Sequence, residues 1–378
     1  MWQPQGIYNE FVLRTPVLLT GNKAVRGLYN LPAVKIAVIH GRALSEEEQT
    51  LFRSTFSKKD IQFFPRSWAG EPDLESLGGT LNDLEAFSPD TILAIGGGSV
   101  IDGAKLCRLL YEFPSFDPSS SSKLNGSLLK THFIAIPTTI GSGAEVSSAA
   151  VYIDKHSETV PRKEMVVLHE LQPEVIVYDE TYLANTPAHL LLASAMDAAA
   201  HLIEGYVSKM HNSMIEMKAE EGLHLLHDEL GTFLMNGAEI NYQRLQYAGH
   251  LGGIVQNHCI VGAAHAVAHQ MTAYSHSEAV ALFLPAVIKM NARDEATSVK
   301  YNVLAVNSGF KSISDLVAFL EQMSEQAITS ERREDMEKFL IYKVSDANFL
   351  NNVKVDRGGR GNPVEITDKY ILELIGGL

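Results

Sequence analysis

The feature that most constrains the fold is a change in hydrophobic pattern near position 185. Before this position, short β-branched runs alternate with helical patterns; the runs are KIAVIH, DTILAIGGG, FIAIPTT and EVIVYD. Such alternation is typical of a parallel sheet with crossover helices. After it, the strand signals stop, and the apolar periodicity predicts long helices over 187–210, 213–235 and 242–271.

Two domains are therefore expected, an α/β domain over 1–185 and an all-α domain over 186–378. The length of 378 residues favours the same division, since one core seldom serves so long a chain. Thr186 and Pro187 mark the boundary, because a threonine oxygen can cap free helix amides and proline suits the first helical position. An early strand in FVLRTPVLL, with an edge that can stay unpaired, is compatible with a homodimer.

Charge and composition argue against several classes of partner. The chain has 45 acidic against 31 basic residues, a formal charge of -14 that would repel a nucleic-acid backbone. No apolar run reaches the length of a membrane span, and the start, MWQPQGIYNEF, lacks the basic and apolar regions of a signal peptide. Cys107 and Cys259 lie in apolar, helix-like segments and indicate buried thiols in a reducing compartment. We expect a cytoplasmic protein without nucleic-acid or membrane partners.

A glycine-rich turn, AIGGGSVIDGAK, follows one predicted strand and opens a helix. The backbone amides of Gly97, Gly98 and Ser99 can approach an anion there without obstruction by a Cβ atom, as in helix amino termini that bind phosphates. The turn fits neither the dinucleotide fingerprint nor the P-loop pattern, so a plain tight turn is the alternative.

A second turn, IPTTIGSGAEVS, also ends a predicted strand. It offers the hydroxyls of Thr138, Thr139 and Ser142 beside the first turn, at the strand ends where α/β proteins bind ligands. The alternative is a small-residue loop that serves packing alone. The context of two such turns favours a nucleotide site.

The segment VIHGRAL ends the first clear strand of the sheet. Nucleotide-binding folds commonly place an acid there to accept hydrogen bonds from a ribose 2′-hydroxyl, but this chain has Gly41 and Arg42. Without the acid, and with a guanidinium able to pair with a 2′-phosphate, NADP is favoured over NAD. In the alternative interpretation, Arg42 is one more solvated surface charge.

Histidines are concentrated in the second half, where ten of the 14 lie between His189 and His276. Asp197 and His201 are four residues apart, as are His265 and His269, so each pair shares one face of a helix. Ser275 and Glu278 have capping-box spacing, which puts His276 in the first turn of a new helix.

A carboxylate with several imidazoles is a ligand set for a first-row divalent metal, and the absence of thiolates argues against a structural zinc clamp. Any one of these histidines, taken alone, is more readily explained as a core residue with satisfied hydrogen bonds. Burying all of them without partners would cost a few kcal/mol each, which a shared cation would offset.

The blocks GGGSVID, IPTTIGSGAEVS, DAAAHLIEGYVS and GAAHAVAH, in this order and spacing, resemble the iron-containing (group III) alcohol dehydrogenase family. The resemblance runs over most of the chain. It implies a Rossmann-like nucleotide-binding domain, a helical metal-binding domain, and a cleft between them that holds cofactor and metal.

Matching positions carry the family's roles onto this sequence. The resemblance implies Fe²⁺ or Zn²⁺ ligands at Asp197, His201, His265 and His276, and His269 is similar to the second histidine beside the nicotinamide, so that His265 and His269 are the expected catalytic residues. The cofactor positions that match are Gly97, Gly98, Ser99, Asp102, Thr138, Thr139, Ser142 and Lys163.

The sequence departs from the family pattern in three places. Gly41 replaces the usual acid, which again favours NADP; Gln270 stands where proline is common, before a shortened loop; and Val364 replaces a customary arginine. These changes predict a substrate unlike simple short-chain alcohols, one that is larger, polyhydroxylated or anionic.

The expected reaction is reversible hydride transfer between a primary alcohol, or its aldehyde, and a nicotinamide, with the metal as Lewis acid. Two other functions compete with it. One is a sugar-phosphate cyclase or lyase of the dehydroquinate synthase-like fold, which would need more basic residues near these ligands. The other is a metal-binding or assembly protein without catalysis.

Overall fold

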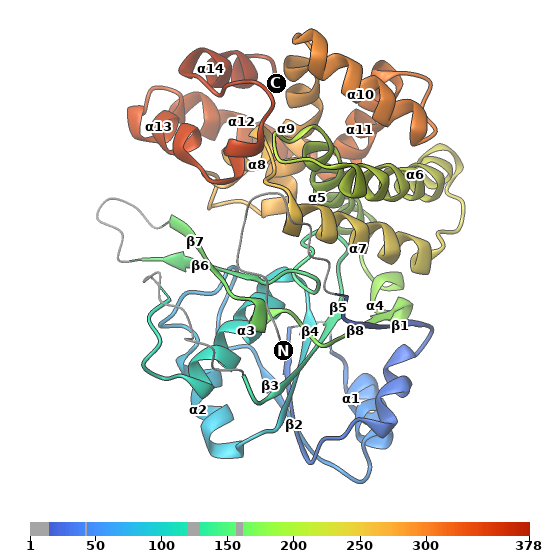
Figure 1. The fold of residues 1–378 in the computed structure, drawn as a ribbon, viewed down its shortest axis with the longest axis vertical. Helices are drawn as coiled ribbons and strands as arrows, with labels where there is room; N and C mark the ends of the chain where they lie inside the picture. The colour runs from blue at the N-terminus through green and yellow to red at the C-terminus, as the bar shows by residue number, and fades with distance from the viewer. Residues whose placement is uncertain (1–14, 42–43, 119–128, 156–161) are drawn as a thin grey trace.

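The computed structural model describes residues 15–41, 44–118, 129–155 and 162–378. Figure 1 shows two parts, a sheet with flanking helices below and a group of helices above. Every strand precedes position 185 in the described chain, and the helices from α5 onward follow it. The predicted combination of an α/β part and an all-α part is therefore confirmed, and its exact division at 185 and 186 stays a prediction.

The main sheet has six parallel strands in the order β1-β8-β5-β4-β2-β3. They are β1 (Val17–Gly21), β2 (Lys35–His40), β3 (Asp60–Pro65), β4 (Thr91–Gly96), β5 (His132–Pro137) and β8 (Val175–Asp179). The predicted early strand forms β1, which lies at one edge of the sheet.

Both faces of the sheet are covered, which explains the continuous apolar runs of its central strands. Alternate residues of β4 belong to different cores: Ile92 and Ala94 pack with α2 (Gly78–Phe87) and α3 (Gly98–Glu112). Leu93 and Ile95 pack on the other face with α1 (Glu46–Thr55) and the 3₁₀ helix η1 (Ala24–Asn30).

A two-stranded antiparallel hairpin, β6 (Ala149–Asp154) with β7 (Arg162–Val167), was not predicted. Nor was β3. Their patterns are weak because polar residues such as Gln62 and Glu164 interrupt the apolar runs. Figure 1 shows the hairpin projecting from the sheet part toward the helical part, so it contributes to the region between them.

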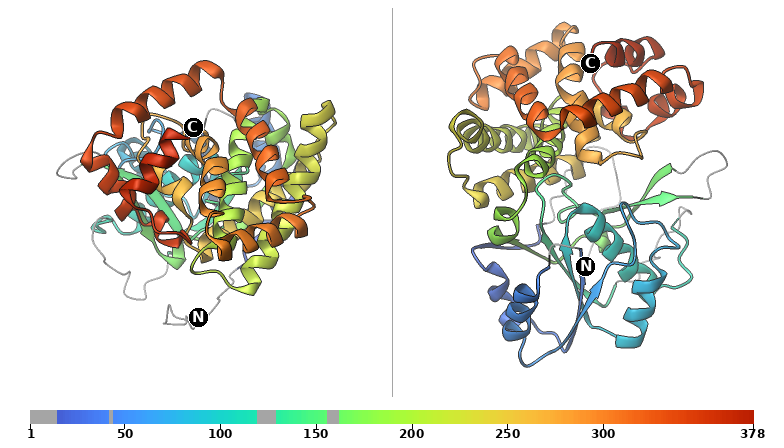
Figure 2. Two further views of the ribbon diagram at one scale, coloured as in Figure 1. Left: turned by 90° about the horizontal axis from the view of Figure 1, so that it is seen from above. Right: turned by 180° about the vertical axis from the view of Figure 1, so that it is seen from behind.

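The helical part is centred on α5 (Ala188–Val207), which is buried along most of its length. The surrounding elements are α6 (Ser213–Asn236), α7 (Tyr242–His258), α8 (Ala263–Ala268), α9 (His276–Asn291), α10 (Glu295–Asn307), α11 (Ile313–Ala327), α12 (Ser330–Lys343), α13 (Ala347–Val355), η3 (Gly358–Gly361) and α14 (Asp368–Gly376). Figure 2 shows them from above and from behind.

The predicted single helix over 242–271 is wrong, because the chain divides it into α7 and α8. The break lies at Cys259–Gly262, where Gly262 is extended and its amide donates to the Glu204 carboxylate at 3.0 Å. The apolar periodicity continues through the break, so periodicity alone could not predict it. The buried Glu204 side chain of α5 determines where α7 ends and α8 begins.

Helix α5 also corrects the expectation that no segment is long enough to span a membrane. Among the described residues it is the one helix with sufficient length and apolar character, and 94% of its apolar window is buried inside the protein. Such burial is characteristic of a core helix.

Short α4 (Glu180–Ala184) links the two parts. The prediction that Thr186 caps α5 is wrong, because its hydroxyl donates to the Tyr182 carbonyl of α4. Helix α5 begins after Pro187 without a side-chain cap. The two parts touch closely where Gly143 has a φ of +60° and a Cβ atom on it would lie 2.4 Å from the Gly253 Cα on α7.

Candidate metal centre

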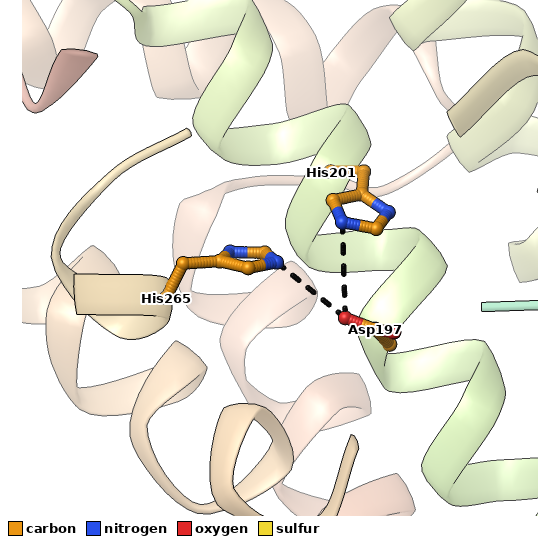
Figure 3. A group of neighbouring side chains, drawn as sticks. All are labelled: Asp197, His201 and His265. Carbon is orange, nitrogen blue, oxygen red and sulfur yellow. Dashed lines mark ion pairs between the residues drawn. The ribbon is translucent and has the colours of Figure 1, made fainter. Parts of the chain in front are cut away.

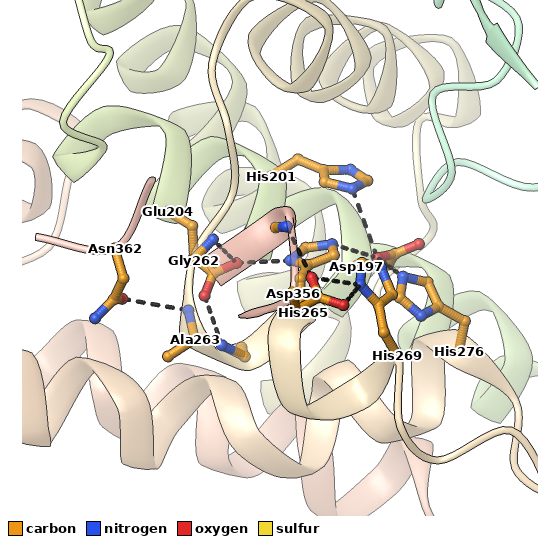
Figure 4. Close-up of polar contacts among 12 residues, drawn as sticks. Asp197, His201, Glu204, Gly262, Ala263, His265, His269, His276, Asp356 and Asn362 are labelled. Atoms are coloured by element: carbon orange, nitrogen blue, oxygen red, sulfur yellow. Dashed lines mark hydrogen bonds and ion pairs between the residues drawn. The ribbon is translucent and has the colours of Figure 1, made fainter. Parts of the chain in front are cut away.

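Three helices bring four predicted ligands to one point. Asp197 and His201 lie on α5, His265 on α8 and His276 at the start of α9. One oxygen of Asp197, Oδ1, is 3.8 Å from His201 Nε2, 3.5 Å from His265 Nε2 and 3.7 Å from His276 Nε2. Figures 3 and 4 show the imidazoles directed at this carboxylate.

The four residues are not equivalent. Asp197, His201 and His265 are buried, and their ligand atoms all lie within 4.8 Å of one another. His276 falls outside that close group, and its side chain is 23% exposed. The centre thus has a closed side formed by α5 and α8 and a more open side formed by α9.

The ionisation states are set by burial and by the groups themselves. Burial raises the pKa of the Asp197 carboxyl, but the three imidazoles outweigh burial and hold that pKa well below its usual range. Burial lowers the pKa of His201 to about 4, against the opposing effect of Asp197. Asp197 is therefore ionised and His201 neutral, the states that ligate a cation.

The other two histidines differ from each other. Burial and the Lys163 ammonium hold the pKa of His276 well below its usual range. Burial also lowers the pKa of His265, but the carboxylates of Asp197 and Glu204 outweigh it and raise the pKa to about 9. A proton and a metal ion therefore compete for His265.

The residues fit a divalent metal ion. Asp197 Oδ1 and His265 Nε2 are buried and have no hydrogen-bond partner in the described structure. Leaving such atoms unpaired costs about 1–3 kcal/mol each. A cation between them would satisfy both, and a carboxylate with imidazoles suits Fe²⁺ or Zn²⁺.

A buried carboxylate that the sequence analysis missed supports this centre. Glu204 accepts from the Gly262 amide at 3.0 Å and from the Ala264 amide at 2.8 Å, and its Oε2 lies 2.6 Å from His265 Nδ1 (Figure 4). It therefore fixes both the α8 backbone and the tautomer that directs His265 Nε2 at Asp197. Its position three residues after His201, on the same face of the helix, was the sequence signal that could have predicted it.

His269 lies beside the ligands on the open side. Its ring is 5.3 Å from that of His276, centroid to centroid, and its Nδ1 is 3.1 Å from each oxygen of Asp356. The carboxylate fixes Nδ1 as the donor, so Nε2 is left as a proton acceptor. Nothing in the sequence links Asp356 to a histidine 87 positions away.

A cleft of about 1340 Å³ joins the metal centre to the sheet. It is lined by fourteen of the fifteen residues predicted for the site: Gly41, Gly97, Gly98, Ser99, Asp102, Thr138, Thr139, Ser142, Lys163, Asp197, His201, His265, His269 and His276. The remaining one, Arg42, lies outside the described residues.

Both glycine-rich turns open into this cleft at the carboxyl edge of the sheet. The first turn begins α3 with Gly97 as its N-terminal flanking residue, as predicted. The second approaches it so closely that a Cβ atom on Gly98 would lie 2.6 Å from the Ser142 Cβ. A Cβ on Gly141 would lie 2.5 Å from the Ser194 carbonyl oxygen and 3.0 Å from Asp197 Oδ2. The second turn thus packs directly against the helix that carries the metal ligands.

Charged residues of the sheet part are paired with one another. Asp102 is buried 3.7 Å from Lys105, and burial raises its pKa to about 7. Lys163, on β7, pairs with Glu71 at 3.1 Å. Both predicted cofactor residues line the cleft, and each already has a partner within the protein.

A second arginine lies beside the end of β2. Arg66 follows β3, its amide donates to the His40 carbonyl at 3.0 Å, and its Nη1 donates to Ser99 Oγ at 2.9 Å. It lines the cleft together with Gly41. The sequence analysis missed it because β3 itself was not recognised.

The predicted capping box at α9 is wrong in its side-chain contacts, although the helix begins at His276 as expected. Ser275 makes no cap hydrogen bond, and its hydroxyl instead lies 3.1 Å from that of Ser277. Glu278 lies 3.4 Å from Arg332 of α12. The Arg332 guanidinium therefore pairs with the Glu278 carboxylate that the capping box required.

Comparison with known families gives matches on both sides of the boundary. Residues 18–180 match the profile described as iron-containing alcohol dehydrogenase. Residues 191–377 match the profile described as the C-terminal part of the Fe-containing alcohol dehydrogenase family. Together they cover most of the chain.

Individual proteins give the same result. An NADPH-dependent butanol dehydrogenase of Clostridium saccharobutylicum is 29% identical over 269 residues, which cover 68% of each protein. An aldehyde-alcohol dehydrogenase of Streptococcus pneumoniae is 29% identical over 277 residues, and the match covers 69% of this chain but 31% of that longer protein. The solved structure of an iron-containing alcohol dehydrogenase from Thermococcus thioreducens has the same fold, with a TM-score of 0.83 at 24% identity over 96% of this chain and 97% of that one.

Proposed function

Because the chain belongs to the iron-containing alcohol dehydrogenase family, we propose that it transfers hydride reversibly between a primary alcohol, or its aldehyde, and a nicotinamide dinucleotide. One observation carries the proposal. Three imidazole nitrogens surround one oxygen of Asp197 at 3.5 to 3.8 Å, in the same cleft as two glycine-rich turns. Metal ligands and anion-binding backbone thus face one space that can hold both reactants.

The residues that would hold the metal are Asp197, His201, His265 and His276. When bound there, Fe²⁺ or Zn²⁺ supplies Lewis acidity toward the substrate oxygen. Glu204 orients His265, and the closed side formed by α5 and α8 keeps water from the ligands.

His269 is the candidate proton carrier. Asp356 holds its Nδ1–H, which leaves Nε2 to accept a proton from an alcohol or to return one to the product. His269 is 21% exposed on the open side of the centre, so a proton can pass from it to solvent. Protons therefore exchange between the reactants and water on the α9 side of the cleft.

We further propose that NADP(H) is preferred. Gly41 supports this, since no carboxylate at that position accepts from a 2′-hydroxyl, and the Arg66 guanidinium beside the first turn suits a 2′-phosphate. The butanol dehydrogenase relative, whose name makes it NADPH-dependent, agrees with this preference. Replacing Arg66 by Gln is expected to raise the KM for NADPH about tenfold and to leave that for NADH within twofold. Equal effects on both nucleotides would rule the role out.

A homodimer in the cytoplasm is the proposed state. The edge strand β1 supports self-association, because Val17 is 60% and Leu18 37% exposed there. Two buried free thiols, Cys107 and Cys259, support a reducing compartment. Light scattering coupled to gel filtration measures the oligomeric state, and a monomer at all concentrations would contradict the proposed homodimer.

The alternatives fare less well. A sugar-phosphate cyclase or lyase is not favoured, because the relatives are named as alcohol dehydrogenases. A protein that binds metal without catalysis needs no cleft lined by both glycine-rich turns. Net oxidation of NADPH by an aldehyde distinguishes the proposal from both, since neither alternative consumes the nucleotide.

The experiment uses the purified chain loaded with Fe(II) or Zn(II) and a panel of aldehydes, with NADPH oxidation followed by absorbance. His265→Ala is expected to lose metal content and turnover together. His189→Ala is the matched control, because His189 is an exposed histidine at the start of the same helix as Asp197. Full turnover by a His265→Ala protein free of metal would overturn the proposed function.

A further inference from the structure

Two arginines lie on the cleft wall beside the metal centre. Arg357 directly precedes η3 and Arg360 lies within it, and both are exposed residues that line the cleft. Neither guanidinium makes a hydrogen bond or ion pair with any residue that the structure describes. Other arginines of this acidic protein do pair with carboxylates, namely Arg244, Arg293 and Arg332.

The acid next to them in sequence is already engaged. The Asp356 carboxylate lies 3.1 Å from His269 Nδ1, 3.3 Å from Gln270 Nε2 and 2.7 Å from the Gly358 amide. Figure 4 shows it directed at His269. Asp356 therefore does not form an ion pair with Arg357, and the two positive charges remain available to a ligand.

The backbone that carries the arginines is held firmly. A Cβ atom on Gly361 would lie 2.1 Å from the Ile260 carbonyl oxygen, and the Gly361 carbonyl accepts from the Lys209 amide at 2.9 Å. Asn362 Oδ1 accepts from the Ala263 amide at 3.2 Å, at the start of α8. The segment is thus fixed to the same helix that carries His265, and this limits how far the arginines can move from the metal centre.

The arginines are also close to the reacting end of the cleft. A Cβ atom on Gly358 would lie 3.4 Å from His269 Cε1, so Arg357 is adjacent in sequence to a glycine that lies near the candidate proton carrier. Burial and the carboxylates of Glu164, Asp154 and Asp117 raise the pKa of Tyr152 on β6 to about 12, and the charge of Arg357 acts in the opposite direction.

We propose that Arg357 and Arg360 form an anion-binding subsite, and that the substrate is a short aldehyde, or the corresponding alcohol, with an anionic group on its far end. This inference rests on the proposed function. Carboxylate, phosphonate and sulfonate groups share the required chemistry, since guanidinium donors pair with their oxygens. Among the described residues, no carboxylate forms an ion pair with either guanidinium, so an anionic substrate can supply that partner.

The anionic group takes no part in the chemical step. Hydride from the reduced nicotinamide adds to the carbonyl carbon, one proton adds to the carbonyl oxygen, and the products are the alcohol and the oxidised nicotinamide. The arginines act by holding the far end of the substrate, which orients the carbonyl toward the metal centre and His269. Their effect is therefore expected in KM and not in kcat.

The test compares two aldehydes of matched length, succinic semialdehyde and its neutral methyl ester. In the metal-loaded protein, Arg357→Gln and Arg360→Gln are each expected to raise the KM for the semialdehyde about tenfold, and the double variant about 100-fold, with kcat within twofold. Kinetics with the ester are expected to stay within twofold. Arg293→Gln, on the outer surface of the helical part, controls for the change in net charge.

A binding experiment gives a readout apart from turnover. Calorimetry of 4-hydroxybutanoate with the NADPH-bound protein, in which no hydride transfer can occur, is expected to show binding that weakens in the double variant and at higher salt. Phosphonate and sulfonate analogues in the same titration identify the anion that is held best.

Three results would overturn the inference. The first is equal kcat/KM for the semialdehyde and the ester in the unaltered protein, and the second is an equal loss of kcat/KM for both aldehydes in the variants. The third is a raised KM for NADPH in the variants, which would assign the arginines to nucleotide binding. Failure of the proposed function is distinct from these, because the loaded protein would then reduce neither aldehyde.

Discussion

The two walls of the cleft are built differently. On the sheet wall, two glycine-rich turns contribute backbone and small side chains, and their glycines leave no room for a Cβ atom, as at Gly98 and Gly141. The helical wall consists of a carboxylate and imidazole groups from three helices, of which Asp197, His201 and His265 are buried and His276 is partly exposed. Substitutions should therefore act by removing ligand atoms on the helical wall and by adding atoms on the sheet wall.

The largest expected effect is on the helical wall. Asp197→Ala removes the oxygen that three imidazoles surround, so metal content should fall to background and turnover by at least about 10³-fold. Metal analysis and NADPH oxidation measure the two effects. Nucleotide affinity, measured by fluorescence titration, should change less than threefold; a parallel collapse of nucleotide binding would break the separation between the walls.

The matched experiment on the sheet wall adds an atom. Gly98→Ala places a Cβ 2.6 Å from that of Ser142, so nucleotide affinity should fall about 10- to 100-fold while metal content stays unchanged. Gly78→Ala is the control, because a Cβ there meets nothing within 4 Å. If the loss is steric, Ser142→Gly in the same chain should recover part of the affinity.

Glu204→Gln tests how far the helical wall depends on support behind its ligands. The amide cannot accept from His265 Nδ1 and the two backbone amides as a carboxylate does, so metal affinity should fall about 10- to 100-fold. Competition with a chelator measures it. Glu220→Gln, which alters a carboxylate of α6 that accepts a hydrogen bond from the Tyr206 hydroxyl of α5, should leave metal affinity unchanged.

Gly253→Ala tests the close contact between the helical part and the sheet part at Gly143 and Gly253. A Cβ there would lie 2.3 Å from Val146 Cγ2 and 2.8 Å from the Gly143 Cα, so the free energy of unfolding should fall by about 1–3 kcal/mol. Thermal melting measures the change against Gly78→Ala. An unchanged melting temperature would mean that this contact relaxes without strain.

The smallest expected signal comes from the two cysteines, which belong to different parts. Burial raises the pKa of the Cys107 thiol far above its usual range and that of Cys259 to about 12, so neither forms the reactive thiolate at neutral pH. A thiol reagent should label the folded protein negligibly and should label 2 thiols in the denatured chain. Rapid labelling of Cys259 alone would show that the helical part opens near the cleft.

The success of the sequence analysis differed between elements for physical reasons. Strands β2, β4, β5 and β8 were predicted because burial on both faces makes them continuously apolar. Strand β3 and the β6–β7 hairpin were missed because their patterns are broken by polar residues. Periodicity also failed at Gly262, where contact with Glu204 ends one helix and begins the next.

Local spacing in the sequence was enough to predict the change from an α/β pattern to helices alone, the two glycine-rich turns, and the i, i+4 pairs on α5 and near α8. The resemblance to the family singled out Asp197, His201, His265 and His276, which the fold brings together, and their role as metal ligands stays a prediction. Packing in three dimensions was needed to show that Glu204 supports His265, that Asp356 engages His269, and that Arg357 and Arg360 line the cleft. These relations join residues far apart in the chain, and no local pattern encodes which distant side chains the packing of helices will bring into contact.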